Sequence, residues 1–289
     1  MNQPVSLDPQ EKRLFVDNFQ RFLKEEVAPH YDDWEKAGIW PRALWRRFGE
    51  QGFLCVDVPE AYGGYGVSFE LSCLVVDEVS KFGFGALASG LSVHSDIVAP
   101  YILNLGSEAQ KEKYLPGMVS GEIVGAIGMT EPSAGSDLQR IKTHAARDGD
   151  QFKINGQKTF ITNGQHCDLI VLATKTDPNQ GAKGMTLFTV DCASTGFNRG
   201  RNLDKMGLHS GDTSELFFDD LIVTTADILG GEGQGFVNMM KELPRERLIL
   251  GVGCVGAAQG AFDLTVAYIT ERQAFGQAVS GFQNSRYKL

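Results

Sequence analysis

The chain has few cysteines and no paired arrangement of them. Its five cysteines stand far apart in the sequence, and none belongs to a Cys-x-x-Cys pair: Cys55, Cys73, Cys167, Cys192 and Cys254. An odd number without a recurring spacing fits neither a disulfide framework nor a zinc site. The five histidines likewise show no metal-ligand spacing. We therefore expect reduced thiols and no bound metal.

The sequence also lacks a block of like charge and a long uncharged apolar run. Lys and Arg number 27 against 36 Asp and Glu, which gives a formal net charge of −9. Such a surface repels phosphate backbones, so we do not expect nucleic acid as a partner. The N-terminal residues include no apolar core flanked by basic residues. No stretch contains about 18 consecutive uncharged apolar residues. We expect a cytoplasmic protein without a membrane span.

The 289 residues divide into three consecutive segments with different residue patterns, which together predict an α+β fold. Residues 1–121 have a helical period and form a predicted N-terminal helical domain. Residues 122–230 form a predicted antiparallel β-domain, because short β-branched runs alternate with turn dipeptides. Residues 231–289 return to the helical period and would begin a helical bundle.

Local signals support this division. Phe15, Phe19 and Phe22 recur at the spacing of one helix face, and Ser107 with Gln110 forms a capping box at a helix start. In the β-domain, the dipeptides at 155–156 and 163–164 are both Asn-Gly, which predicts a tight turn at each.

The stretch GVGCVG at 251–256 matches the glycine pattern of a dinucleotide-binding turn. In that interpretation the chain is an NAD-dependent Rossmann dehydrogenase, with RLIL as its first strand and Glu271 on the ribose. However, an unbroken helical period runs through the region, and no further strands follow residue 272. We instead predict one long amphipathic helix from about Arg245 to Arg272, begun by Pro244. Its apolar face would carry Leu248, Val252, Val255, Phe262, Val266 and Ile269.

Another face of this predicted helix is nearly bare of side chains. Gly253, Ala257 and Gly260 lie on it together with Leu250, and Glu246 stands at its N-terminal end. A bare face allows another helix, or a planar ligand, to approach closely. Glu246 is then either a first-turn acid favoured by the helix dipole or a functional carboxylate.

The stretch GMTEPSAGSD at 128–137 combines Thr, Ser and small residues after a predicted strand. Its amides and hydroxyls could line a polar, planar ring, or it could be an ordinary polar loop. It resembles the signature of the acyl-CoA dehydrogenase flavoproteins. The resemblance continues through INGQKTFITNG, KMGLHSGDTSELFFDDLIV, GEGQGF, RERLILGVGCVGAAQGAFD and ERQAFG. It covers residue 8 to the end and is closest to the long-chain and isovaleryl branch.

The resemblance implies an N-terminal helical domain, a central β-domain and a C-terminal four-helix domain, of which the chain would contain the first part. It implies FAD-dependent α,β-dehydrogenation of an acyl-CoA thioester to a trans-2-enoyl-CoA, in fatty-acid β-oxidation or branched-chain amino-acid breakdown. Electrons would pass to an electron-transferring flavoprotein, and the assembly would be a homodimer or homotetramer. His94 could line an acyl pocket or be an ordinary surface or satisfied core histidine. The alternative is a truncated, flavin-free pseudoenzyme or scaffold.

The resemblance also implies the cofactor contacts. They are Ile127, Met129, Thr130, Ser136, Phe160, Thr162, Arg272, Phe275 and Gln283. Met129 and Thr130 would lie near the pyrimidine end of the flavin ring, with Phe160 and Thr162 against its other side. Arg272, Phe275 and Gln283 would contact the adenine half of a FAD molecule that is bound mainly by a neighbouring subunit. Many members have Trp in place of Phe160 and Gly in place of Ser133.

The reaction needs a base, and the resemblance offers one. Most members place the catalytic glutamate in a C-terminal segment that is missing here. The isovaleryl and long-chain enzymes instead place it on the helix that opens with Glu-Arg-Leu, where this chain has Glu246. Arg247 resembles a neighbour that contacts the CoA ligand, and Ser136 would lie near the pyrophosphate or the thioester.

Overall fold

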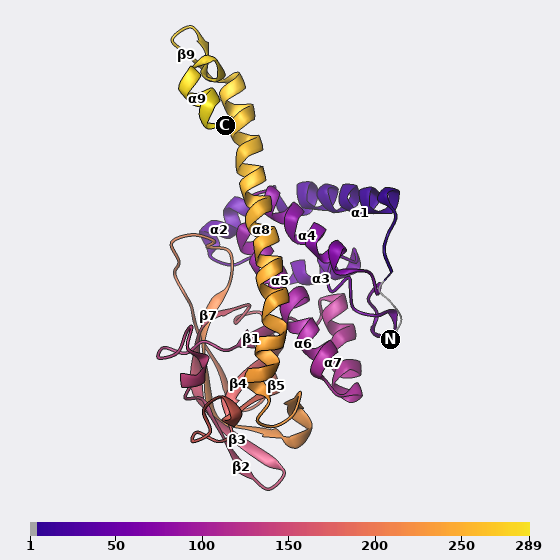
Figure 1. The fold of residues 1–289 in the computed structure, drawn as a ribbon, viewed down its shortest axis with the longest axis vertical. Coiled ribbons are helices and arrows are strands. Elements are labelled where there is room, and N and C mark those ends of the chain that lie inside the picture. Colours follow the sequence, from indigo (N-terminus) through magenta and orange to yellow (C-terminus); the bar gives the residue numbers. More distant parts are fainter. Residues whose placement is uncertain (1–4) are drawn as a thin grey trace.

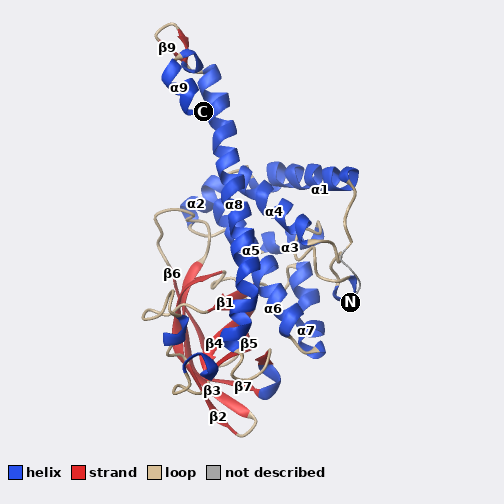
Figure 2. Ribbon diagram, viewed as in Figure 1, coloured by secondary structure: helices blue, strands red, loops and turns tan. Residues whose placement is uncertain are grey.

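The computed structural model describes residues 5–289 and shows three parts (Figures 1 and 2). A group of short helices packs beside a β-sheet. One long helix, α8 (Gly235–Glu271), runs past both and projects beyond them, with the C-terminus near its far tip (Figure 1). The expected α+β class is confirmed by this arrangement.

The described residues of the first part form short helices with well-defined starts. They are α1 (Pro9–Phe22), α2 (Tyr31–Ala37), α3 (Ala43–Glu50), α4 (Phe69–Lys81), α5 (Gly85–Ser92), α6 (Ala99–Leu105) and α7 (Glu108–Ser120), with π-helical turns at Leu23–Val27 and Val93–Val98. Ser107 caps α7 in the predicted capping box with Gln110. Asp8 and Glu11 form a second box at α1. Both boxes satisfy N–H groups that a helix start leaves free.

Aromatic side chains form the centre of this helical part. Phe19 and Phe22 are buried, and Phe15 packs against the same cluster, as their helical spacing predicts. The ring centroids of Phe19 and Phe53 lie 4.6 Å apart, and those of Phe22 and Phe48 lie 4.8 Å apart. These contacts hold α1 against α3 and the segment after it.

The second part is an eight-stranded sheet in the order β6-β7-β3-β2-β4-β5-β8, with β1 paired to β4. Its strands are β1 (Gly125–Gly128), β2 (His144–Asp148), β3 (Gln151–Thr162), β4 (Leu169–Lys175), β5 (Met185–Asp191), β6 (Phe197–Asn202), β7 (Thr213–Thr224) and β8 (Ile228–Leu229). Most pairs are antiparallel, as expected. Strands β1 and β2 both lie parallel to β4, and β2 forms an antiparallel hairpin with β3.

The predicted turn at Asn155–Gly156 is wrong, because both residues lie inside β3. Gly156 is needed there for space. A Cβ atom on it would lie 2.6 Å from Oγ1 of Thr143, and its φ is +153°. The register with β7 shifts at this point, which marks an irregularity of the strand. At the other dipeptide, Asn163 has a φ of +65° and a turn does follow β3.

The predicted start of the long helix is also wrong. α8 begins at Gly235, and Pro244 lies inside it. A proline removes one helical hydrogen bond, but Met239 before it and Ile249 after it are both buried and hold the two halves in place. Glu246 therefore lies in the helix interior, and it is not a first-turn acid stabilised by the helix dipole.

The glycine pattern at 251–256 lies wholly inside α8, which rules out a Rossmann turn there. Only part of the bare face is a packing surface for another helix, since Gly253 and Gly260 lie against α4 while Leu250 and Ala257 are exposed. A Cβ on Gly256 would lie 2.7 Å from the carbonyl oxygen of Asp77, and one on Gly260 would lie 2.1 Å from that of Lys81. Both carbonyls belong to α4, so the glycines let the two helix backbones approach closely.

The predicted apolar face of α8 is largely exposed in the described residues. Leu248 is 57% exposed and Val255 is 69% exposed, because the glycine face, and not this one, meets α4. Beyond Gly260 nearly every residue of the helix is exposed.

Two helical stretches are long and apolar enough to cross a bilayer. Within Gly85–Leu105, 72% of the most apolar window is buried in the protein, as in a core helix. Within Gly235–Glu271 only 17% is buried. Both stretches contain charged residues, so neither is an uncharged apolar run. Length and composition do not separate a core helix from a span, so the absence of a membrane span stays a prediction.

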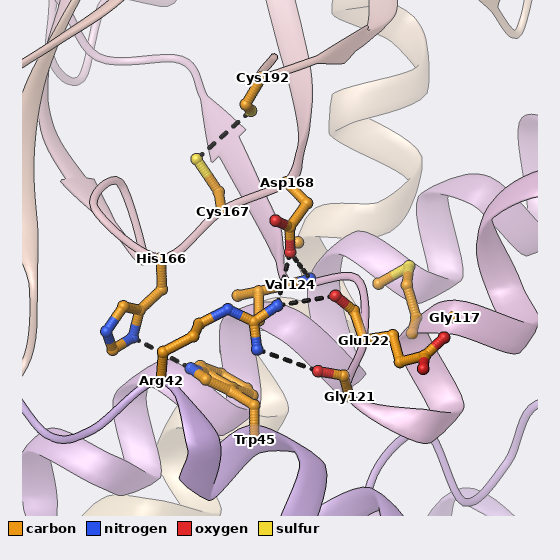
Figure 3. Close-up of polar contacts among 12 residues, drawn as sticks. Arg42, Trp45, Gly117, Gly121, Glu122, Val124, His166, Cys167, Asp168 and Cys192 are labelled. Atoms are coloured by element: carbon orange, nitrogen blue, oxygen red, sulfur yellow. Dashed lines mark hydrogen bonds and ion pairs between the residues drawn. The ribbon is translucent and has the colours of Figure 1, made fainter.

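An ion-pair network joins the helical part to the sheet (Figure 3). The guanidinium of Arg42 donates to Oδ2 of Asp168 over 2.7 Å and to the carbonyl oxygen of Gly121 over 3.0 Å. The same Oδ2 accepts the backbone N–H of Val124 over 2.8 Å. The network therefore fixes the chain where it enters β1.

The cysteines are free thiols in the described part of the chain, in agreement with the sequence. Cys167 and Cys192, which are remote in sequence, become neighbours beside β4 and β5. Their sulfur atoms lie 3.5 Å apart (Figure 3), which is a contact and not a bond.

Candidate functional site

Two segments named from the sequence come together at the end of β1. The loop after β1 carries Met129 and Thr130, and the C-terminal end of β3 carries Thr159 and Phe160. The N–H of Thr159 donates to the carbonyl oxygen of Thr130 over 3.0 Å. The structure thus joins the two proposed flavin segments, which are separated by some thirty positions in the chain.

Phe160 has the conformation expected of a functional residue. Its side chain is 67% exposed although it lies between Thr159 and Ile161, which are both buried. Its φ is +58°, a left-handed value that is strained for a bulky residue. The register with β7 shifts between Lys158 and Ile161, so a bulge turns Phe160 out of the alternation.

The other proposed flavin contacts on these segments differ in exposure. Ile127 pairs with Val171 in the sheet and is half-buried. Thr162 is half-buried at the end of β3, and Ser136 is exposed on the loop. A Cβ added to Gly135 would meet no atom within 4 Å. An exposed aromatic ring beside an open loop of small residues fits a planar flavin.

A buried ion pair that sequence reasoning missed lies beneath these segments. Nζ of Lys158 lies 2.8 Å from Oε1 of Glu131, and the two side chains are 0% and 3% exposed. Burial lowers the pKa of Lys158, against the pull of Glu131. Burial acts to raise the pKa of Glu131, but Lys158 and backbone donors outweigh it and lower this pKa. Lys158 lies in phase with the buried Phe152 and Ile154 of β3, but a lysine at such a position is buried only with a partner, and Glu131 is far away in the sequence.

The proposed base lies on α8 and contacts α6. The hydroxyl of Tyr101, which is fully buried, donates to Oε1 of Glu246 over 3.0 Å. Burial raises the pKa of the half-buried Glu246, while the Tyr101 hydrogen bond opposes the shift and nearby Glu242 adds to it. A carboxylate with a raised pKa is suited to general-base chemistry.

A second carboxylate lies one helical turn before Glu246. Glu242 is half-buried, and both of its oxygens accept from Nδ2 of Asn104, over 3.1 and 3.2 Å. Burial raises its pKa too. Because both of its oxygens are occupied by one amide, Glu242 is held in place by α6.

Arg245 anchors α8 beside Glu246. Its guanidinium lies 2.5 Å from Oδ2 of Asp57 and 3.8 Å from Oδ1 of Asp96. Asp96 is 3% exposed, and burial together with the charge of Asp57 raises its pKa to about 7. Arg247, two positions further on, is exposed.

The three residues expected to contact the adenine half of FAD lie elsewhere. Arg272 ends α8, Phe275 forms the tip of the hairpin between β9 (Gln273–Ala274) and β10 (Gln277–Ala278), and Gln283 begins α9 (Gln283–Lys288). All three are exposed, Phe275 to 97%. They sit at the projecting end of α8, away from the sheet (Figure 1). A single chain therefore does not bring them to the other proposed flavin residues.

His94 is a core residue and not a wall of a ligand pocket. It is fully buried, its Nδ1 accepts from the N–H of Gly125 over 3.0 Å, and its Nε2 lies 2.9 Å from the carbonyl oxygen of Met118. Both ring nitrogens are thus used. Within residues 5–289, no group of three His, Cys, Asp or Glu side chains is placed to hold a metal ion.

Comparisons with known proteins agree with this architecture. Family models match residues 9–122 (acyl-CoA dehydrogenase, N-terminal domain), 126–221 (middle domain) and 233–289 (C-terminal domain). The long-chain specific acyl-CoA dehydrogenase, mitochondrial, of Sus scrofa is 41% identical over 281 residues, which cover 96% of this chain and 65% of that protein. The isovaleryl-CoA dehydrogenase, mitochondrial, of Arabidopsis thaliana is 36% identical over 271 residues, covering 93% and 66%. The chain thus spans slightly less than two thirds of these curated relatives.

Solved structures give the same result. The crystal structure of an acyl-CoA dehydrogenase from Geobacillus kaustophilus superposes with a TM-score of 0.93 at 48% identity, covering 98% of this chain and 74% of that one. A glutaryl-CoA dehydrogenase from Mycobacterium smegmatis, solved in complex with FADH2, gives a TM-score of 0.89 at 29% identity, covering 98% and 71%.

Proposed function

Because the chain belongs to the acyl-CoA dehydrogenase family, we propose that it binds FAD and removes two hydrogens from Cα and Cβ of an acyl-CoA thioester, with Glu246 as the base. The observation that carries the proposal is the Glu246 carboxylate itself. It is half-buried, has a raised pKa and is oriented by the Tyr101 hydroxyl. No structural requirement of α8 alone explains a carboxylate held in this way.

The role of Glu246 is to take the proton from Cα. A base works best when its pKa lies near the working pH, and burial moves the pKa of Glu246 upward in that direction. Tyr101 holds one carboxylate oxygen in place, and the other oxygen would take the proton. FAD, when bound, supplies the acceptor for the hydride from Cβ, and the product is the trans-2-enoyl-CoA.

The residues that would hold FAD come from two places. Phe160 and Thr162 on one segment and Ile127, Met129 and Thr130 on the other would contact the flavin ring. Support comes from the strained, exposed Phe160 and from the small residues beside it.

Arg272, Phe275 and Gln283 would contact the adenine half of a FAD held mainly by another subunit. Their exposure at the far end of α8 supports this assignment. A homodimer or homotetramer is therefore part of the proposal.

We assign Ser136 and Arg247 to the CoA thioester. Both are exposed, and Arg247 directly follows Glu246 along the chain. The acyl group would be long, since the long-chain relative of Sus scrofa is more similar than the isovaleryl relative of Arabidopsis thaliana. The electrons would pass to an electron-transferring flavoprotein.

The experiment is a spectroscopic titration of the full chain. Purified protein should carry flavin absorbance, and an anaerobic saturating acyl-CoA should bleach it. A survey of straight-chain acyl-CoAs of increasing length, with isovaleryl-CoA beside them, identifies the substrate. A colourless protein that takes up no added FAD would favour the flavin-free scaffold, and flavin that no acyl-CoA bleaches would reject the proposed reaction.

A further inference from the structure

The Glu131–Lys158 ion pair is a buried feature that the proposed reaction does not use. Its side chains are 3% and 0% exposed, and the two charged atoms lie 2.8 Å apart. Taking two charges out of water is unfavourable, and a buried pair is weak evidence for stability in itself. An explanation must therefore come from what the pair holds together.

Glu131 joins three separate backbone segments. Its Oε1 accepts from Nζ of Lys158 and, over 3.0 Å, from the N–H of Thr143. Its Oε2 accepts from the N–H of Lys142 over 2.6 Å. The carboxylate thus ties the loop after β1 both to the start of β2 and to β3.

Lys158 completes the connection from the other side. Besides Glu131, its Nζ donates to the carbonyl oxygen of Met129 over 3.0 Å. Met129 is a proposed flavin contact directly before Thr130 and Glu131, and Phe160 follows Lys158 by two positions. The ion pair therefore lies between the two segments that would contact the ring.

We propose that Lys158 and Glu131 are positioning residues that set the spacing of the Met129–Thr130 loop and the Phe160–Thr162 segment before FAD binds. The inference rests on the proposed function. A site held in its bound geometry loses less conformational freedom when the ligand arrives, so it binds more tightly. Lys158 holds the Met129 carbonyl directly and lies two positions before Phe160 in β3, which makes FAD affinity the property that the pair controls.

The test compares FAD affinity with folding stability in the full chain. Lys158→Met removes one charge and leaves Glu131 buried and unpaired, so both folding and FAD binding should weaken. The decisive variant is the double change Glu131→Gln with Lys158→Met, in which no unpaired charge remains. Replacing both members of a buried pair is often neutral for stability.

A matched control lies on the same strand. Lys153 pairs with Asp220 over 3.4 Å, but these side chains are 49% and 61% exposed. Lys153→Met removes the same charge from β3 without disturbing the loop after β1. It should leave both FAD affinity and thermal unfolding unchanged.

The measured quantities are the FAD dissociation constant of the apoprotein, by fluorescence titration, and the thermal unfolding midpoint without FAD. We expect the double variant to fold with a somewhat lower unfolding midpoint, because the amide has one acceptor oxygen for the N–H groups of Lys142 and Thr143, and to bind FAD roughly tenfold more weakly or worse, since hydrogen bonds from a charged donor are lost. A double variant that folds and binds FAD like wild type overturns the inference but not the proposed function. A double variant that fails to fold shows that the pair serves stability and also overturns it. Wild-type protein that binds no FAD overturns both.

Discussion

The buried hydroxyl of Tyr101 donates a hydrogen bond to Oε1 of Glu246 over 3.0 Å and so links α6 to α8 at the proposed base. Tyr101 is fully buried, and both burial and the Glu246 charge raise its pKa, so it remains a proton donor at working pH. A donor of this kind stabilises the charged carboxylate. The contact therefore limits how far burial can raise the pKa of Glu246.

Tyr101→Phe should move the acidic limb of the pH–rate profile to higher pH. The base must be deprotonated to act, so the rate rises as pH passes through the pKa of Glu246. Without the hydroxyl, that pKa rises further, and the rate at neutral pH falls. The measurement is anaerobic flavin reduction by acyl-CoA as a function of pH.

Tyr62→Phe is the matched control for this change. The Tyr62 hydroxyl also donates to a glutamate, Glu108, but this pair is exposed and lies in the N-terminal helical part. Its loss should leave the pH profile unchanged. An unshifted profile in Tyr101→Phe would mean that Tyr101 serves packing alone.

Glu246→Gln should abolish most turnover while FAD binding persists. The amide keeps the shape of the side chain but accepts no proton, and a positioned base contributes about 10²–10⁴ in rate. Stopped-flow bleaching of the flavin measures the step directly.

Glu242→Gln, one turn earlier on the same helix face, is the comparison. Both Glu242 oxygens face Asn104, so this variant should keep its rate. If Glu242→Gln lost its rate while Glu246→Gln stayed active, Glu242 and not Glu246 would be the base.

The fold could be predicted from the sequence where local signals and burial coincide. The Ser107–Gln110 box and the Phe15–Phe22 period each depend on neighbours within one helix, and the structure confirms both. Pro244 and Asn155–Gly156 are signals of the same local kind, yet both predictions failed. At Pro244, buried residues on each side keep the helix continuous, and at Gly156 the close approach of Thr143 replaces the turn.

In the candidate site, too, local motifs could be predicted and long-range contacts could not. Met129, Thr130 and Phe160 were named by resemblance to a family motif, and the structure brings their segments together. Lys158 lies in the same motif, in phase with the buried Phe152 and Ile154, but was missed because its burial as a charged residue depends on Glu131, which lies 27 positions earlier in the chain. Long-range contacts of this kind leave no periodic signal in the sequence.

Asp96→Asn should flatten the dependence of stability on pH. Burial and the charge of Asp57 raise the pKa of Asp96 from 3.8 to about 7, so the folded protein binds this proton more tightly than the unfolded chain. The resulting stability is fully present below pH 3.8 and is lost as pH rises toward about 7. Asparagine does not titrate, so in Asp96→Asn this pH-dependent loss of folding stability should be absent. Urea unfolding at several pH values between these limits measures it, and parallel curves for variant and wild type would contradict the assignment.

The glycines of α8 provide a test of helix packing with an internal control. In Gly260→Ala, the new Cβ would lie 2.1 Å from the Lys81 carbonyl oxygen, so α8 must move away from α4. Overpacking of this kind destabilises by about 1–3 kcal/mol. In Gly251→Ala, the Cβ meets no atom within 4 Å, and the higher helix propensity of alanine should stabilise by roughly 1 kcal/mol. Urea unfolding of the two variants should therefore shift the midpoint in opposite directions. Equal stabilisation by both would mean that Gly260 does not contact α4 in solution, and the glycine face would again be open to a ligand.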